Sequence, residues 1–238
     1  MKIGLTYTGT EEKHNNYVRW LQSSSSKPEI VTLSADKDNL EELNDCDALV
    51  LSGGVDMHPE FYNSSTIEYP NAPEQGFQRE RDLFEIAAFE LAQWNNLPVL
   101  GICRGMQLMN CALKGDLEQD IGKLNPRHKA ENLIDKKHDI RVEPDSVLSE
   151  IADEGNFQVN SAHHQRIKRL SKELKMNAIA DDGTIEGVEW ADKKDKPFLL
   201  GVQWHPERMY KFELQDSPLS KNLREHFISA IKKSMATK

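Results

Sequence analysis

Short apolar runs separated by polar stretches recur along the first half of the chain. Four of them, each four or five residues long as buried strands usually are, lie at 3–7, 29–33, 47–51 and 99–102. Apolar residues at helical spacing mark two stretches between them, one around Tyr17–Leu21 and one from Gln78 to Asn95. The apolar stripe of the second stretch contains Leu83, Ile86, Ala87 and Leu91. Strands that alternate with helices predict a parallel sheet covered on both faces.

The second half of the chain has a less regular pattern. An irregular stretch begins at 117–121 and contains His128 and His138, and three further strands are predicted at 176–180, 185–190 and 198–203. Near the end, Ser217 and Pro218 are typical of the N-cap and first position of a helix. The whole pattern predicts an α/β fold, with one domain over residues 1–238 built on an open, mostly parallel sheet flanked by helices on both faces.

Composition limits the location and the partners that we expect. The 238 residues carry a net charge of -9, which argues against nucleic acid because phosphate binding needs a basic face. No apolar run approaches the ~20 residues of a membrane span, and the N-terminus does not resemble a signal peptide. The three cysteines (Cys46, Cys103 and Cys111) make no complete disulfide set. We therefore expect a cytoplasmic protein with neither nucleic acid nor membrane as a partner.

Cys103 lies where the predicted strand at 99–102 ends and a predicted helix begins at Arg104. Gly101 and Gly105 stand two residues to either side, a spacing that suits a tight strand-to-helix turn with strained backbone at its apex. Such a turn exposes the sulfur at the positive N-terminus of a helix, where thiolate is favoured over thiol. Most free cysteines are buried and inert, but the flanking glycines favour a nucleophile here.

Two glycines, Gly53 and Gly54, follow the predicted strand at 47–51. Ligands of open α/β sheets bind at the carboxyl ends of strands, and a loop without side chains there can bring its N–H groups close to a developing oxyanion. An ordinary turn is the alternative explanation. The loop that continues to Gly76 is of a length that is usually functional.

His205 and Glu207 follow the last predicted strand and are two residues apart. In extended chain their side chains share a face, so the carboxylate can orient the imidazole while the imidazole serves a nucleophile. The alternative is a loop histidine beside a surface glutamate.

Four histidines raise the question of a metal site: His128, His138, His163 and His164. We predict no metal, because the adjacent His163 and His164 cannot easily chelate one ion and no cysteine or carboxylate stands at zinc-like spacing. The polar run at 159–165 instead predicts the wall of a substrate pocket.

These motifs resemble those of a known family. The stretch at 101–107, followed about a hundred residues later by His205-Pro206-Glu207, resembles the class I glutamine amidotransferases. More narrowly, the stretches at 53–59, 119–121, 159–165 and 201–207 resemble the gamma-glutamyl-gamma-aminobutyrate hydrolase family of peptidase C26 type. The resemblance runs from the first strand to Glu207 and implies a flavodoxin-like three-layer sandwich.

The resemblance also implies an activity, the hydrolysis of the gamma-glutamyl amide bond of small gamma-glutamyl amines, as in polyamine breakdown. Cys103 would attack the gamma-glutamyl carbonyl, His205 would carry the proton to the leaving amine, and Glu207 would orient His205. Hydrolysis through a thioester needs neither a metal nor an organic cofactor, so we expect none.

Further residues enter through the resemblance alone. The oxyanion would be held by the backbone N–H groups of Gly53, Gly54 and Arg104. The glutamyl pocket would be bordered by Gln107, Ser161 and His163. The resemblance also suggests a homodimer.

Two other functions stay open at this point. The chain would be a glutaminase subunit if it supplied ammonia to a separate synthetase. A non-catalytic binding protein on the same fold would need Cys103 to be unreactive toward alkylating reagents.

Overall fold

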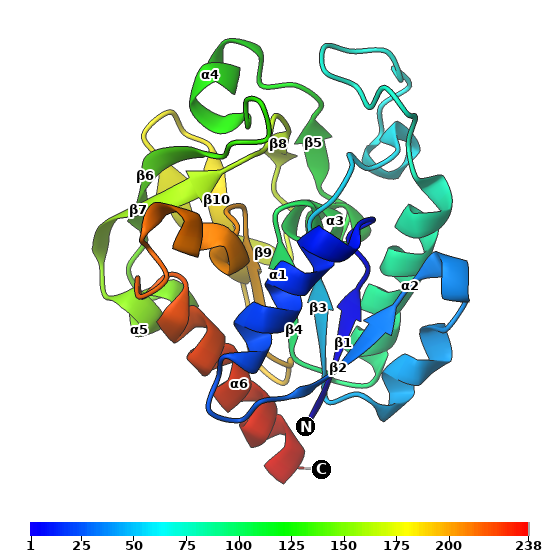
Figure 1. The fold of residues 1–238 in the computed structure, drawn as a ribbon, viewed down its shortest axis with the longest axis vertical. Coiled ribbons are helices and arrows are strands. Elements are labelled where there is room, and N and C mark those ends of the chain that lie inside the picture. The colour runs from blue at the N-terminus through cyan, green and yellow to red at the C-terminus, as the bar shows by residue number, and fades with distance from the viewer. Residues whose placement is uncertain (238) are drawn as a thin grey trace.

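The computed structural model describes residues 1–237, and a nine-stranded sheet forms its centre (Figure 1). The strand order is β2-β1-β3-β4-β11-β10-β9-β6-β7. The strands are β1 (Lys2–Thr6), β2 (Glu29–Leu33), β3 (Ala48–Leu51), β4 (Val99–Ile102), β6 (Lys136–Val142), β7 (Gly155–Ser161), β9 (Leu174–Ala180), β10 (Ile185–Trp190) and β11 (Leu199–Val202). A separate two-stranded sheet pairs β5 (Asp116–Glu118) with β8 (Arg166–Arg169).

The sheet has a parallel half and an antiparallel half. Neighbours from β2 to β11 run parallel, while β10, β9, β6 and β7 continue the sheet with antiparallel pairs. All five parallel strands coincide with predicted strands to within two residues, so the predicted α/β fold is confirmed. Because these strands share one direction, the loops after β3, β4 and β11 meet at the same edge of the sheet.

Helices cover both faces of the sheet. They are α1 (Glu11–Gln22), α2 (Arg79–Trp94), α3 (Arg104–Ala112), α4 (Asn125–His128), α5 (Val147–Ala152) and α6 (Lys221–Ala236). Alternation along β3 shows the division, because Ala48 and Val50 pack with α1, α5 and α6 whereas Leu49 and Leu51 pack with α2 and α3. The result is a three-layer arrangement (Figure 1).

Three expectations from the pattern are wrong. The stretch with His138 is strand β6, whose inward positions alternate with charged outward ones, and the polar histidine masked this alternation. The C-terminal helix begins at Lys221, and Ser217 starts a separate hydrogen-bonded turn before it.

The third error concerns the buried face of α2. The predicted apolar stripe is displaced, and Leu83 is exposed while Asp82 and Glu85 are buried with Ala88 and Phe89. The two carboxylates are drawn inward by a buried guanidinium, which is described below.

None of the helices in residues 1–237 combines the length and the apolar character that crossing a membrane requires.

Candidate active site

Cys103 occupies a strained turn between β4 and α3. Its φ of 53° and ψ of -107° lie outside the regions that most residues adopt, which confirms the predicted strained apex. A Cβ added to Gly105 would lie 2.2 Å from the backbone oxygen of Leu51, so only glycine allows α3 to start against β3. The backbone N–H of Cys103 donates to the oxygen of Val202 at 2.7 Å. The turn is thereby held between two strands of the sheet.

His205 and Glu207 form a buried pair after β11. Nδ1 of His205 lies 2.8 Å from Oε1 of Glu207, so the other ring nitrogen is free to serve the sulfur. A Cβ added to Gly53 would lie 2.9 Å from Cε1 of His205 and 3.7 Å from the Cβ of Cys103. The structure therefore brings together Cys103, His205, Glu207 and the Gly53 loop.

The charges around His205 favour its protonated form. Burial and the guanidinium of Arg208 lower its pKa, but the carboxylate of Glu207 and the sulfur of Cys103 outweigh them, and the pKa is raised to about 9. The same imidazole helps to hold the pKa of the buried Glu207 below its usual range, against the effect of burial. The pair is thus an anion beside a cation, as a histidine that gives up protons requires.

Two neighbours of this group were missed by the sequence reasoning. The amide of Gln203 donates to Sγ of Cys103 at 3.5 Å and accepts from Nε2 of Gln107 at 3.1 Å. The hydroxyl of Tyr17 lies 3.5 Å from Nδ1 of His205. Gln203 lies within the motif that carries the family resemblance, whereas nothing in the local pattern of α1 distinguishes Tyr17.

The position of Tyr17 corrects the predicted set of oxyanion donors. The backbone N–H of Gly53 donates to the Tyr17 hydroxyl at 2.9 Å and is therefore occupied. The N–H of Gly54 and of Arg104, the first residue of α3, donate to no acceptor within residues 1–237. Both residues line a cavity beside Cys103, so these two amides are the ones that can face a ligand.

The side chain of Arg104 is buried and reaches α2. Its guanidinium pairs with both Asp82 and Glu85. The guanidinium of Arg81 donates to the carboxylate of the same Glu85 at 2.7 Å and to the backbone oxygen of Gly53 at 3.0 Å. Burial works to raise the pKa of Glu85, but the guanidinium groups of Arg104 and Arg81 outweigh it and hold that pKa below its usual range. This charged network connects α2, α3 and the Gly53 loop.

The cavity beside Cys103 has a volume of about 230 Å³. It is lined by Gly54, Asp56, Cys103, Arg104, Gln107, Ala162, His163, His164 and Gln165. Gln107 and His163, which were predicted to border the glutamyl pocket, both line this cavity. Ser161 is buried outside this lining, and its hydroxyl donates to the backbone oxygen of His128 at 2.9 Å.

A charged pair faces the cavity from the loops. Nε2 of His164 lies 3.1 Å from Asp56, and its Nδ1 lies 3.3 Å from Asp120. Burial lowers the pKa of His164, but these two carboxylates outweigh it and raise the pKa above the usual value. Tyr69, from the long loop, donates to the other oxygen of Asp56 at 2.9 Å. The wall therefore offers both a positive and a negative group.

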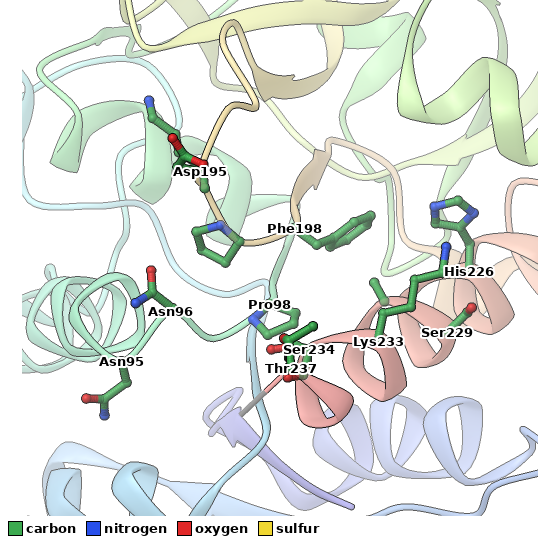
Figure 2. Close-up of a pocket in the computed structure, with 13 residues that line it drawn as sticks. Asn95, Asn96, Pro98, Asp195, Phe198, His226, Ser229, Lys233, Ser234 and Thr237 are labelled. Atoms are coloured by element: carbon green, nitrogen blue, oxygen red, sulfur yellow. Dashed lines mark hydrogen bonds between the residues drawn. The ribbon is translucent and has the colours of Figure 1, made fainter.

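A larger cavity, of about 680 Å³, lies at the opposite edge of the sheet. Figure 2 shows it between α6, with Ser229 and Lys233, and the residues Pro98 and Phe198, which precede β4 and β11. Ligands of open α/β sheets bind at the carboxyl ends of strands, and this cavity lies at the amino ends. The smaller cavity beside Cys103 is therefore the candidate active site.

Comparison with known proteins identifies the family of this chain. The profile of the peptidase C26 family matches residues 6–207. Protein NtpR of Enterococcus hirae is 33% identical over 221 residues, which cover 90% of each chain. Gamma-glutamyl-gamma-aminobutyrate hydrolase PuuD of Escherichia coli strain K12 is 33% identical over 177 residues, 71% of this chain and 67% of that one.

Among solved structures, the glutaminase domain of Trypanosoma brucei CTPS with bound acivicin superposes with a TM-score of 0.65 at 17% identity, over 98% of this chain and 94% of that one. At that identity the likeness concerns the fold, which is of the class I glutamine amidotransferase type predicted from the motifs. The family profile and the two relatives show that the chain belongs to the peptidase C26 family.

Proposed function

We propose that this protein hydrolyses the gamma-glutamyl amide bond of small gamma-glutamyl amines through a thioester on Cys103. The observation that carries the proposal is the convergence of the strained Cys103 turn and the hydrogen-bonded His205–Glu207 pair on the Gly53 loop. Membership of the peptidase C26 family and the likeness to a gamma-glutamyl-gamma-aminobutyrate hydrolase support it. The three side chains form the proposed triad.

The proposed reaction has two stages. In the first, Sγ of Cys103 attacks the gamma carbonyl, the C–N bond breaks, and protonated His205 gives its proton to the leaving amine. In the second, His205 takes a proton from a water molecule that attacks the thioester, and glutamate leaves as the sulfur is released. Glu207 keeps the imidazole in the orientation that both stages need.

The negative charge that develops on the carbonyl oxygen needs donors that are already in place. The N–H groups of Gly54 and Arg104 fit this role, because both belong to residues that line the cavity and neither is engaged within residues 1–237. The N–H of Gly53 does not take part, since it holds Tyr17.

The charged wall of the cavity suits a free glutamyl end. A gamma-glutamyl group carries an alpha-carboxylate and an alpha-ammonium, and the wall offers the imidazole of His164, whose pKa is raised by its two carboxylate neighbours, and the carboxylate of Asp56. Gln107 adds a neutral polar side chain at the same cavity. The glutamyl end would be enclosed while the amine projects toward solvent.

The second candidate is a glutaminase subunit that passes ammonia to a synthetase partner. The structural likeness to the CTPS glutaminase domain favours it, because the same fold serves glutamine there. This candidate predicts weak activity of the chain alone and stimulation by a co-purifying synthetase.

The test compares glutamate release from gamma-glutamyl-gamma-aminobutyrate and from glutamine, with Cys103→Ala as the inactive control. We expect a preference for the former and a loss of kcat of roughly 10⁴-fold or more in the variant. Preference for glutamine would instead support the second candidate, the glutaminase subunit. Equal release by wild type and Cys103→Ala would refute both.

A further inference from the structure

A second cluster of titratable side chains lies beside the site, and one of its members, His163, also lines the cavity beside Cys103. None of its side chains takes part in the bond-making and bond-breaking steps proposed above. It consists of His128 at the end of α4, His138 on β6, His163 after β7 and Glu186 on β10, and all four are buried. We call it the histidine–glutamate cluster. One potential ligand atom from each residue lies within 4.8 Å of all the others.

The spacing of these atoms suits a metal ion. Oxygen Oε1 of Glu186 lies 3.6 Å from Nδ1 of His128, 3.5 Å from Nε2 of His138 and 3.4 Å from Nε2 of His163. These separations are too long for good hydrogen bonds. A tetrahedral zinc with bonds of about 2.0–2.1 Å places its ligand atoms about 3.3 Å apart.

The atoms that face one another are also those without partners in the described chain, residues 1–237. Nδ1 of His128, Nε2 of His138, Nε2 of His163 and both carboxylate oxygens of Glu186 are buried there and accept or donate no hydrogen bond. Leaving five buried polar atoms unpaired around one point is costly. A cation at that point removes the cost by coordinating the ring nitrogens and the carboxylate.

Each histidine is held by its other ring nitrogen. Nε2 of His128 lies 2.7 Å from Asp182, Nδ1 of His138 lies 3.3 Å from the backbone oxygen of Asp139, and Nδ1 of His163 lies 2.9 Å from that of Gln165. An acceptor at one nitrogen places the proton there and leaves the lone pair of the other nitrogen directed into the cluster. Metal-bound histidines in proteins show this arrangement.

We propose that the histidine–glutamate cluster binds one divalent transition-metal ion, with Zn²⁺ the best match to three imidazoles and one carboxylate. Four protein ligands complete a tetrahedron and leave no open position, so the ion is structural and does not activate water. This replaces the expectation of a metal-free protein, which rested on sequence spacing and paired His163 with His164. The structure separates those neighbours, since His164 faces Asp56 and Asp120.

The ion would fasten the cavity wall. It would join α4 and the segment at 162–165 to the sheet at β6 and β10, at the top of the view in Figure 1. The oxygen of Gln165 that holds His163 also accepts from Gln107 on α3, at 3.2 Å. The ion would therefore be connected to α3, the helix that begins after Cys103, through His163, the backbone oxygen of Gln165 and the side chain of Gln107.

The direct test is the metal content of the purified, untagged chain, measured by plasma mass spectrometry. We expect roughly one zinc per chain, its loss in His138→Gln and in Glu186→Gln, and wild-type content in His226→Gln, whose histidine lies on α6 outside the cluster. Retention of zinc by His138→Gln and Glu186→Gln would overturn the site.

A second measurement uses the wild type alone, so that misfolding of a variant does not decide the outcome. Chelator-treated protein is titrated with Co²⁺, and we expect the visible absorption of four-coordinate cobalt to saturate at one equivalent. Adding Zn²⁺ to the metal-free protein should raise Tm by roughly 5–10 °C. Wild type that holds no metal as purified and takes up neither Zn²⁺ nor Co²⁺ would refute the proposal, whatever its activity.

Discussion

At the scale of single residues, the candidate site contains two energetically unfavourable features, a strained backbone at Cys103 and a buried carboxylate at Glu207. The backbone at Cys103 has a positive φ, which costs a residue other than glycine on the order of 1–3 kcal/mol. The close packing at Gly101 and Gly105 and the backbone hydrogen bond from Cys103 to Val202 hold this conformation in place. Glu207 is a buried carboxylate, and His205 is the partner that makes its burial tolerable.

The charges around His205 predict where activity ends at high pH. Burial and Arg208 lower its pKa, Glu207 and Cys103 outweigh them to give about 9, and the phenol of Tyr17 stays neutral because burial raises its pKa well above the usual value. In the proposed reaction, protonated His205 gives its proton to the leaving amine, so kcat/KM should fall as pH rises through about 9.

Replacing the carboxylate tests this assignment. Glu207→Gln removes a group that raises the pKa of His205, so the alkaline limb should move to lower pH, and kcat should fall by roughly 10²–10⁴-fold. The measurement is the pH profile of kcat/KM for both proteins. A limb that stays at the same pH would show that a group other than His205 sets it.

At the scale of elements, the carboxyl edge is assembled by a buried ion network. Arg104 on α3 fastens Asp82 and Glu85 of α2, and Arg81 of α2 reaches the loop after β3. For this reason the buried face of α2 carries two carboxylates in addition to its apolar residues, such as Ala88 and Phe89. Buried charges are tolerated between two helices while every charge has its partner. Removal of one partner leaves another charge buried and unpaired, which is strongly destabilising.

Removing the shared guanidinium should destabilise the fold. Arg104→Leu leaves Asp82 and Glu85 buried without their cation, and we expect a loss of about 3–5 kcal/mol in the free energy of unfolding, measured with urea. Arg141→Leu, which breaks the surface pair with Glu143, is the matched control and should change it by less than about 1 kcal/mol. Equal effects of the two substitutions would contradict the role given to the network.

At the scale of the whole molecule, each of the two edges of the parallel half-sheet borders a different cavity. The parallel strands point their carboxyl ends toward Cys103 and the loops at its cavity, while their amino ends border the larger cavity in Figure 2. Strand direction, and not cavity size, is the reason for placing the candidate active site at the carboxyl edge.

A bulky side chain placed in each cavity in turn tests which cavity is needed for activity. Ala162→Trp, beside Cys103, should lower kcat/KM on the order of 10²-fold because the glutamyl group is displaced from the sulfur. Ser229→Trp, on the exposed side of α6, should leave kcat/KM within about twofold of wild type. Steady-state kinetics with gamma-glutamyl-gamma-aminobutyrate decides, and a larger loss in Ser229→Trp would move the site to the other edge.

The sequence by itself determined what depends on short stretches of chain. The apolar runs of the parallel strands and the glycines around Cys103 are local patterns, and the structure contains the elements that they predict. The two-residue spacing of His205 and Glu207 correctly predicted that their side chains meet, but Glu207 lies in a short 3-10 helix, Pro206–Phe212, and not in extended chain. Local patterns carry this information because the backbone periodicity of a strand or turn spans only a few residues.

Only the tertiary structure decided which distant groups meet. Tyr17 reaches His205 across 188 positions of the chain, and the amide of Gln203 reaches Cys103 across 100. The histidine–glutamate cluster draws on four separate segments of the chain, and Glu186 is more than twenty positions from each of its histidines. Contacts of this kind are set by the order of strands in the sheet and by which buried polar groups need partners, and neither leaves a period in the sequence.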